Sequence, residues 1–381
     1  MISKEDLIAA YDDCCYRKRS SLGYREFVED EVKNLNDLYD SLVSQTWKPG
    51  SSIAFCVEKP KLREVFAAPF RDRIVHHLIR FKFGETFEAV QVPESYSCRV
   101  GRGNYRAVRH LKADMCVISD CWTSEAWVLK CDLKGFFMSI KKDILWEIVS
   151  GIIKIYHGDD PDLPWWEWLI KEVIYDQPEK HCVMKGKLSL WDQLPADKSL
   201  FSLDECVGLP IGNLTSQIFA NLYMTPFDWW ATKILKLPGY VRYVDDFVAV
   251  SKDKSQLLKF LHDARIWLKE NLGVTLHPKK VYLQEVKKGV KFLGYVIKPG
   301  RLYAGNQVVY AFRKAAEKMC RSENPEEYIP SVNSYLGILR HTWSYGIRWE
   351  VFASLPWDKL GPLGWRVSSK KLQCIKKWKK F

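Results

Sequence analysis

The sequence predicts an α+β fold, in which antiparallel strands carry a few acidic side chains and helices pack around them. Residues 240–250 place Asp245 and Asp246 between two runs of β-branched and aromatic residues, the pattern of a β-hairpin. Asp132 ends a second apolar strand. Apolar residues recur at helical spacing in four stretches, residues 4–46, 253–271, 308–319 and 332–345.

The acidic residues at the ends of these strands predict a metal site. Adjacent carboxylates repel each other, so the turn is either simply solvated or neutralised by a hard divalent cation. The second acidic strand favours the cation. If the two strands lie side by side, Asp132, Asp245 and Asp246 converge and can hold two Mg²⁺ ions, with Mn²⁺ as a substitute. Such a pair aligns a 3′-hydroxyl with a nucleotide α-phosphate.

Composition bounds the class of protein. The chain has 381 residues, 47% of them hydrophobic and 27% charged, which is enough for two or three subdomains. Its formal net charge of +12 suits a polyanionic partner, although an ordinary basic protein has the same charge. Eleven cysteines without CxxC spacing indicate reduced thiols. Without a long apolar run or a targeting peptide, the sequence predicts a cytoplasmic protein with no membrane contact.

The acidic motifs resemble those of prokaryotic reverse transcriptases. Residues 243–246 resemble motif C of that family, and Asp132 with Phe137 resembles motif A. The remaining motifs follow in family order across about residues 50–345: motif 1 at 59–77, motif 2 at 93–104, motif B at 208–223, motif D at 276–281 and motif E at 289–297. The resemblance implies a right-hand fold of fingers, palm with an antiparallel sheet and small helical thumb. It also implies RNA-directed DNA synthesis from dNTPs.

The resemblance assigns roles to individual residues. It implies that Asp132, Asp245 and Asp246 are catalytic and bind the metal, and that Lys280 donates a proton to pyrophosphate unless it is a plain surface lysine. The residues implied to contact the nucleotide are Arg63, Lys61, Phe137, Pro210, Ile211, Gly212 and Gln217. Phe137 would crowd the sugar 2′ position, the alternative being a core phenylalanine. Arg99 and Arg102 of motif 2 could contact template phosphate or the nucleotide.

One departure in motif B bears on the biological setting. Most members have glutamine where this chain has Ile211, and the aliphatic residue resembles the reverse transcriptases of diversity-generating retroelements, which copy adenines unfaithfully. The partners implied are a template RNA, its cDNA, and a small accessory protein or a second reverse transcriptase subunit. Two alternatives stay open: an antiphage reverse transcriptase that makes DNA from a noncoding RNA, and an RNA-binding scaffold without polymerase activity.

The motifs divide the chain into five predicted segments. They are N-terminal helices and fingers at 1–120, palm with motif A at 121–147, an aromatic-rich helical insertion at 148–205, palm with motifs B to E at 206–305, and a helical thumb with a basic tail at 306–381. The tryptophans of the insertion are expected to pack between helices rather than to stack on bases. The lysines at 370–380 are expected to form a basic helix or a fraying end.

Overall fold

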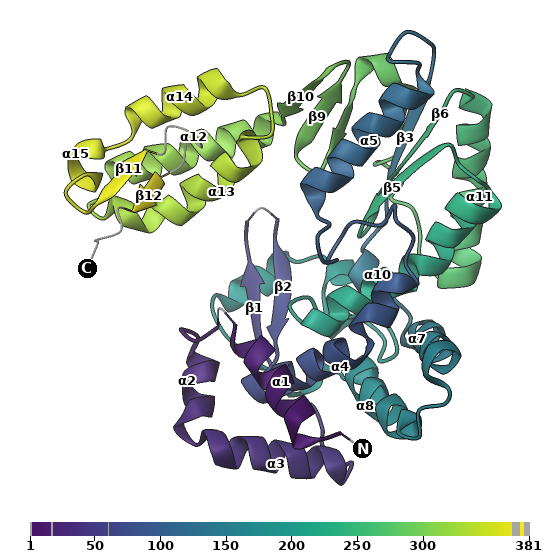
Figure 1. The fold of residues 1–381 in the computed structure, drawn as a ribbon, viewed down its shortest axis with the longest axis vertical. Helices are drawn as coiled ribbons and strands as arrows, with labels where there is room; N and C mark the ends of the chain where they lie inside the picture. The colour runs from purple at the N-terminus through teal and green to yellow at the C-terminus, as the bar shows by residue number, and fades with distance from the viewer. Residues whose placement is uncertain (1, 17, 60, 368–373, 377–381) are drawn as a thin grey trace.

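A computed structural model describes residues 2–16, 18–59, 61–367 and 374–376, which form lobes around a central sheet (Figure 1). The N-terminal helices lie at one end, the central sheet lies toward the other, and a lobe with helices α12 to α15 stands apart (Figure 1). This arrangement confirms the predicted mixture of helices with antiparallel sheet. Among the described helices, none combines the length and the apolar character that crossing a membrane requires.

The N-terminal lobe surrounds a hairpin with helices. Ser3 caps its first helix, where its hydroxyl accepts from the Asp6 backbone N–H. The predicted hairpin forms with Ile53 opposite Ala67. The elements of this lobe are α1 (Lys4–Cys15), α2 (Leu22–Glu29), α3 (Glu31–Val43), β1 (Ile53–Val57), β2 (Arg63–Ala67), α4 (Phe70–Ala89) and the short β4 (Val183–Met184), which pairs parallel with β1.

The central sheet is antiparallel and buried on both faces. Its strands are β3 (Trp127–Asp132), β5 (Gly239–Tyr243), β6 (Asp246–Ser251) and β7 (Tyr282–Glu285), in the order β5-β6-β3-β7. Helix α5 (Asn104–Ile118) covers the face that carries Val128 and Val248. Helices α10 (Leu214–Trp229) and α11 (Lys254–Leu272) cover the face that carries Leu129 and Phe247. Side chains of alternate strand residues are therefore held on both sides.

The tryptophan-rich segment packs into the core, as predicted. The Trp165 ring lies 4.7 Å from that of Trp166, and its indole N–H donates to the Leu42 carbonyl. The segment contains α6 (Phe136–Ser139), α7 (Lys142–His157), α8 (Leu163–Tyr175), α9 (Pro178–His181), η1 (Leu188–Gln193), η2 (Ala196–Lys198) and η3 (Leu200–Ser202), while a π-helical turn η4 (Trp230–Ile234) continues α10. The boundary placed at residue 147 falls inside α7.

The C-terminal lobe, the thumb, has a core of its own around Phe312, Leu336 and Phe352. A three-stranded sheet leads into it, and Tyr105 of α5 stacks on His341 with ring centroids 3.8 Å apart. The elements are η5 (Val286–Lys288), β8 (Val290–Phe292), β9 (Tyr295–Lys298), β10 (Arg301–Ala304), α12 (Asn306–Arg321), η6 (Pro325–Tyr328), α13 (Ile329–Leu339), α14 (Tyr345–Ser354), α15 (Trp357–Leu360), β11 (Trp365–Val367) and β12 (Cys374–Lys376).

The thumb differs from the predicted helix at 332–345, and the structure describes only part of the predicted basic tail. The helix expected across 332–345 is divided, because α13 ends at Leu339 and α14 begins at Tyr345. The Ser344 hydroxyl donates to the Leu339 carbonyl and so helps to close the first of these helices. Of the predicted basic tail, residues 374–376 form β12, while 370–373 and 377–380 lie outside the described residues.

Candidate active site

The acidic hairpin turns one residue earlier than predicted. Tyr243 pairs with Asp246, so the two residues of the turn are Val244 and Asp245, and Asp246 is the first residue of β6. On the neighbouring strand, Asp132 lies directly opposite Asp246. The Asp245 carbonyl also accepts a hydrogen bond from the Leu133 backbone N–H at 3.0 Å. The sheet register therefore brings the three predicted acids to one edge.

The turn itself is strained. Val244 has a φ of +56°, in the left-handed region that β-branched residues avoid, and such a conformation costs about 1–3 kcal/mol. A fully buried side chain helps to hold it: Nη1 of Arg242 donates to the Val244 carbonyl at 3.0 Å. The strained backbone thus gains a fixed hydrogen-bond donor from the strand that leads into the turn.

Arg242 is fixed in its turn by a buried carboxylate that sequence reasoning did not single out. Its Nη2 donates to Asp228 Oδ2 at 2.6 Å and its Nε to Asp228 Oδ1 at 2.7 Å, and neither side chain is exposed. The Tyr240 hydroxyl donates to the same carboxylate at 2.8 Å. Burial disfavours the charge on Arg242, but the Asp228 carboxylate outweighs burial and raises the pKa of Arg242. This network connects α10 to the Val244–Asp245 turn.

The three acids differ in the lysines that lie near them. Lys280 Nζ lies 2.6 Å from Asp132 Oδ1, and Lys130 Nζ lies 3.4 Å from Asp246 Oδ1. Burial raises the pKa of Asp245 to about 6, and the charges of Asp246 and Asp132 act in the same direction. Burial also raises the pKa of Asp246, opposed by Lys130. The site therefore holds more negative charge than its two lysines neutralise.

The donor chemistry of these acids fits a hard divalent cation. Carboxylate oxygens are the ligands that Mg²⁺ prefers, and Oδ1 of Asp246 is buried without a hydrogen bond from any described residue. As placed, the side chains do not form a ready cluster: within the described ranges, no group of three His, Cys, Asp or Glu residues is arranged to hold a metal ion. With Lys280 on Asp132 and Lys130 near Asp246, a cation would have to displace lysine contacts.

The predicted motif B loop is hydrogen-bonded to the hairpin β1–β2 on one side and to α6 on the other. The Phe66 backbone N–H of β2 donates to the Ile211 carbonyl at 2.8 Å, and the Leu209 N–H donates to the Phe137 carbonyl at 2.9 Å. Gly212 has a φ of +128°, and a Cβ there would lie 2.6 Å from the Phe66 carbonyl oxygen. Only glycine permits this approach. Pro210 is buried, Ile211 half-buried and Gly212 exposed.

Asn213 links the motif B loop to the hairpin rather than capping α10 through its side chain. It occupies the N-cap position, yet its side chain makes no capping hydrogen bond to the helix. Instead its Oδ1 accepts from the Ala68 backbone N–H at 3.4 Å, which adds a second link between the loop and the hairpin. Gln217, on the first turns of α10, is exposed, and its Oε1 accepts from the Cys98 thiol at 3.3 Å.

The predicted triphosphate-binding residues stand on the hairpin. Arg63 is the first residue of β2 and Lys61 lies in the preceding turn, and both are exposed. Neither makes an ion pair to another described residue, which leaves both cations available to a phosphate. Phe137, in α6, is half-buried beside the motif B loop, to which its carbonyl is bonded. Among the described residues, no hydrogen bond or ion pair joins Lys61, Arg63 or Phe137 to the three acids.

The prediction for Arg99 is wrong. Its Nε donates to Glu88 Oε2 at 2.7 Å, and its Nη1 donates to the Val92 and Ser95 carbonyls, so the guanidinium is used within the fold. The side chain is only 6% exposed. Arg102 donates to the Pro93 carbonyl and lies over the Tyr96 ring.

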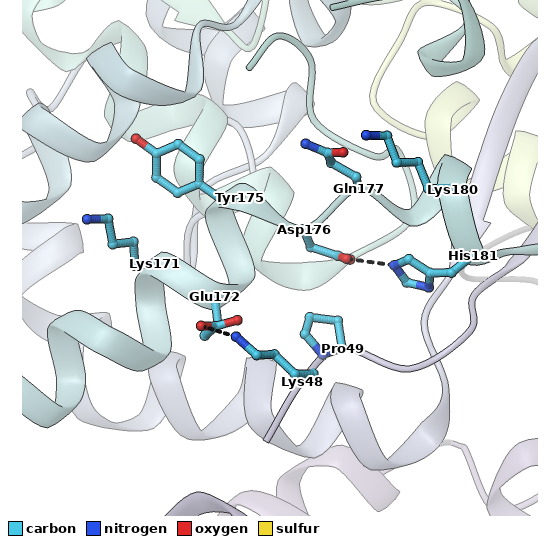
Figure 2. Close-up of a pocket in the computed structure, with 9 residues that line it drawn as sticks. All are labelled: Lys48, Pro49, Lys171, Glu172, Tyr175, Asp176, Gln177, Lys180 and His181. Carbon is cyan, nitrogen blue, oxygen red and sulfur yellow. Dashed lines mark hydrogen bonds and ion pairs between the residues drawn. The ribbon is translucent and has the colours of Figure 1, made fainter. Parts of the chain in front are cut away.

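An open pocket of about 580 Å³ lies outside this site, between the segment before β1 and helices α8 and α9 (Figure 2). Most of its charges are paired, while Lys171 Nζ lies over the Trp146 ring, 5.5 Å from its centre. Lys48 Nζ lies 2.6 Å from Glu172, and His181 Nε2 lies 2.9 Å from Asp176 (Figure 2), while Lys180 pairs with Glu205. The paired cations of this pocket have little left for a phosphate.

An antiparallel sheet with acids on adjacent strands, flanked by a hairpin lobe and a helical lobe, is the right-hand fold of nucleic-acid polymerases. Telomerase from Candida tropicalis in its apo form shares this fold: the TM-score is 0.51 at 12% identity, over 84% of this chain and 61% of that one. Telomerase from Candida albicans with a TWJ fragment of telomeric RNA gives a TM-score of 0.49 at 12% identity, over 86% of this chain and 59% of that one.

The family match specifies the class further. Residues 108–297, from α5 through most of β9, match the family described as reverse transcriptase (RNA-dependent DNA polymerase). This match covers the predicted motifs A to E and agrees with the resemblance that those motifs indicate. A curated relative, the putative COX1/OXI3 intron 2 protein of Saccharomyces cerevisiae, is 37% identical over 67 residues, which is 17% of this chain and 8% of that protein. The chain thus spans only part of the proteins it matches.

Proposed function

We propose that this protein is an RNA-directed DNA polymerase, which copies a cognate noncoding RNA into cDNA from dNTPs by two-metal nucleotidyl transfer. The observation that carries the proposal is the pairing of Asp132 with Asp246 across β3 and β6, with Asp245 in the adjoining turn. Acids placed by strand register are held to a fraction of an ångström, as phosphoryl-transfer sites require.

The remaining residues supply binding and proton transfer. Asp132 and Asp245 would hold the divalent cations, which when bound offset the charge that develops on the phosphate oxygens. Arg63, assisted by Lys61, holds the triphosphate through the paired donors of its guanidinium. Phe137 crowds the sugar 2′ position and so disfavours ribonucleotides. Lys280, which is bonded to Asp132 in the free protein, exchanges that partner for phosphate and protonates the departing pyrophosphate.

The first test removes one acid. Asp245→Asn is nearly isosteric and should abolish primer extension on a primed RNA template with dNTPs and Mg²⁺, while RNA affinity stays within a few fold. Asp192→Asn, at an exposed aspartate in η1, is the matched control and should extend as the wild type does. DNA synthesis retained by Asp245→Asn would contradict the metal assignment. If wild type made no DNA yet bound RNA, the scaffold alternative would replace the polymerase.

The setting we propose is a diversity-generating retroelement in a prokaryotic cytoplasm, with a small accessory protein or a second subunit bound to the same RNA. Its support is Ile211, whose aliphatic side chain stands where most family members have the glutamine that monitors the nascent pair. An aliphatic residue cannot hydrogen-bond to a base edge, which loosens selection.

The product made on co-purified RNA tests this setting. Near-complete cDNA with errors concentrated opposite template adenines is expected, and Ile211→Gln should reduce those errors. Repetitive or self-templated DNA would point instead to antiphage defence. A template lying within an intron would place the protein beside its yeast relative, which is named as an intron protein.

A further inference from the structure

The thumb carries exposed aromatic side chains that the catalytic site does not use. Tyr310 of α12, Trp343 in the turn after α13, and Tyr345 and Trp349 of α14 are between 55% and 69% exposed. Single exposed aromatic residues are ordinary, but a group of them on one lobe marks a binding surface. We call these four residues, together with Arg301 and Arg348, the thumb aromatic surface.

The helices bring the members of this surface together. Arg313 of α12 pairs with Glu350 of α14 at 3.0 Å, and the Cys320 thiol donates to the Ser354 carbonyl. Both contacts advance in the same direction along the two helices, so the helices run parallel. One turn before Arg313, Tyr310 is therefore level with the first turn of α14, where Tyr345 lies. The Trp343 backbone N–H donates to the Leu302 carbonyl, which places Trp343 beside β10 at the same end.

Cations accompany the rings. The Arg301 guanidinium lies 4.7 Å from the Trp343 ring centre, Lys314 Nζ lies 5.6 Å from that of Tyr310, and the Arg348 guanidinium lies 6.0 Å from that of Tyr345. Neither Arg301 nor Arg348 has a carboxylate partner among the described residues, and Nε of Arg348 is buried without an acceptor. Glu350, the residue after Trp349, is paired with Arg313.

The surface faces away from the fingers. Helix α14 lies on the side of the thumb opposite the hairpin β1–β2, with α13 between them (Figure 1). Val351 and Phe352 of α14 are buried in the thumb core, while Tyr345 and Trp349 are 67% and 55% exposed. A duplex held between thumb, palm and fingers would contact α13 and leave this surface free.

We infer that the thumb aromatic surface binds single-stranded RNA, a part of the template RNA that lies outside the product duplex. This inference rests on the proposed polymerase function. Unpaired bases stack on exposed aromatic rings, and unpaired guanidiniums take the adjoining phosphates, which together make a sequence-tolerant site. The newly made DNA is paired with its template, so the strand with unpaired bases is the RNA. A second hold on that strand keeps it tethered while the template advances through the palm.

The chemistry favours RNA over a protein partner. Protein interfaces are centred on aromatic residues as well, but their centres are depleted of unpaired charge. Here every ring but Trp349 has a cation beside it, and the exposed Arg301 has no carboxylate partner among the described residues. Phosphate oxygens can pair with its guanidinium directly.

The test measures binding of an unstructured oligonucleotide of about ten uridines, a length that covers one such site. In fluorescence anisotropy at low salt, Trp343→Ala/Trp349→Ala should bind at least about tenfold more weakly than wild type, since each stacked base contributes substantially. Trp343→Phe/Trp349→Phe should restore most of the affinity because it restores the rings. Arg301→Gln should lower the slope of log affinity against log salt by about 0.7, the value for one phosphate on a single strand.

Controls separate this inference from the proposed function. Tyr156→Ala removes an equally exposed ring from α7 and should bind the oligonucleotide as wild type does. All variants should extend a short template–primer hybrid with a minimal overhang at the wild-type rate. Unchanged oligonucleotide binding by the double alanine variant would overturn the inference, as would tighter binding of oligothymidylate or an equal loss of extension on the short hybrid. A wild type that extends no hybrid would refute the polymerase instead, since binding is measured separately.

Discussion

The palm sheet and the thumb both contain arginine–carboxylate pairs and aromatic residues, but the palm buries them and the thumb exposes them. In the palm, an arginine–aspartate pair is wholly buried, and strands are covered on both faces. In the thumb, the pair Arg313–Glu350 is 49% and 62% exposed, and large aromatic rings stand in solvent. Buried polar groups in the palm hold the backbone of a turn in place, whereas the polar groups of the thumb lie at its surface.

The difference matches what each region is proposed to hold. Two-metal chemistry needs carboxylates in fixed positions, which a sheet buried on both faces and tied by Arg242 can provide. A strand of changing sequence needs rings and cations that adapt to each base. Four predictions test this contrast, from the largest effect to the smallest.

Arg242→Leu leaves the Asp228 carboxylate buried without its partner. We expect the free energy of unfolding to fall by about 3–5 kcal/mol, with primer extension lost, in denaturant titrations and incorporation assays. The double variant Arg242→Leu/Asp228→Leu should recover much of the stability but not the activity, because the Val244 carbonyl still lacks its donor. Recovered activity would show that the turn does not need Arg242.

Leu336→Ala opens a cavity in the thumb core and should cost about 3 kcal/mol locally. Since this core is separate from those of the palm, hydrogen exchange should quicken in α12, α13 and α14 but not in β3, β5 or β6. Equal loss of protection in the palm strands would mean that both regions unfold as one unit.

Gly212→Ala introduces a Cβ against the Phe66 carbonyl at a left-handed φ, and should cost about 1–3 kcal/mol and slow nucleotide incorporation. Gly151→Ala is the matched control, because Gly151 lies within α7 with open space where its Cβ would point. It should be neutral or slightly stabilising. Equal effects of the two changes would count against close packing of the motif B loop on β2.

Arg313→Ala breaks the exposed thumb pair and should lower the unfolding free energy by less than about 1 kcal/mol, with the loss vanishing at high salt. Thermal unfolding at two salt concentrations measures this. A larger loss of unfolding free energy that does not depend on salt would mean that this pair stabilises the fold as the buried Arg242–Asp228 pair does.

The sequence was sufficient for the fold because its strands, hairpins and helix α11 are marked by local patterns. Asp253 begins that helix and Gly273 ends it in the left-handed conformation, both readable from residue type. The three acids were found for the same reason, since Asp132 ends an apolar strand, Asp246 starts another, and Asp245 lies in the turn before it.

What the sequence did not reveal depends on contacts between distant segments. Arg242 sits in an alternating strand and reads as a solvent-facing residue until Asp228 is placed behind it. Arg99 reads as a free cation until Glu88 is placed beside it. No glycine or proline lies between α13 and α14. The Ser344 side chain makes the hydrogen bond that closes α13.

The bond between Phe66 and Ile211 has a mechanical consequence. It joins the strand that carries Arg63 to the loop proposed to sense the base pair, and Gly212 removes any side chain that would hold the two apart. Any swing of the hairpin that keeps this bond must pull the loop along. Triphosphate binding by the hairpin and base-pair sensing by the loop would then be mechanically coupled. A substitution in β2, far from any base, could therefore alter the error rate.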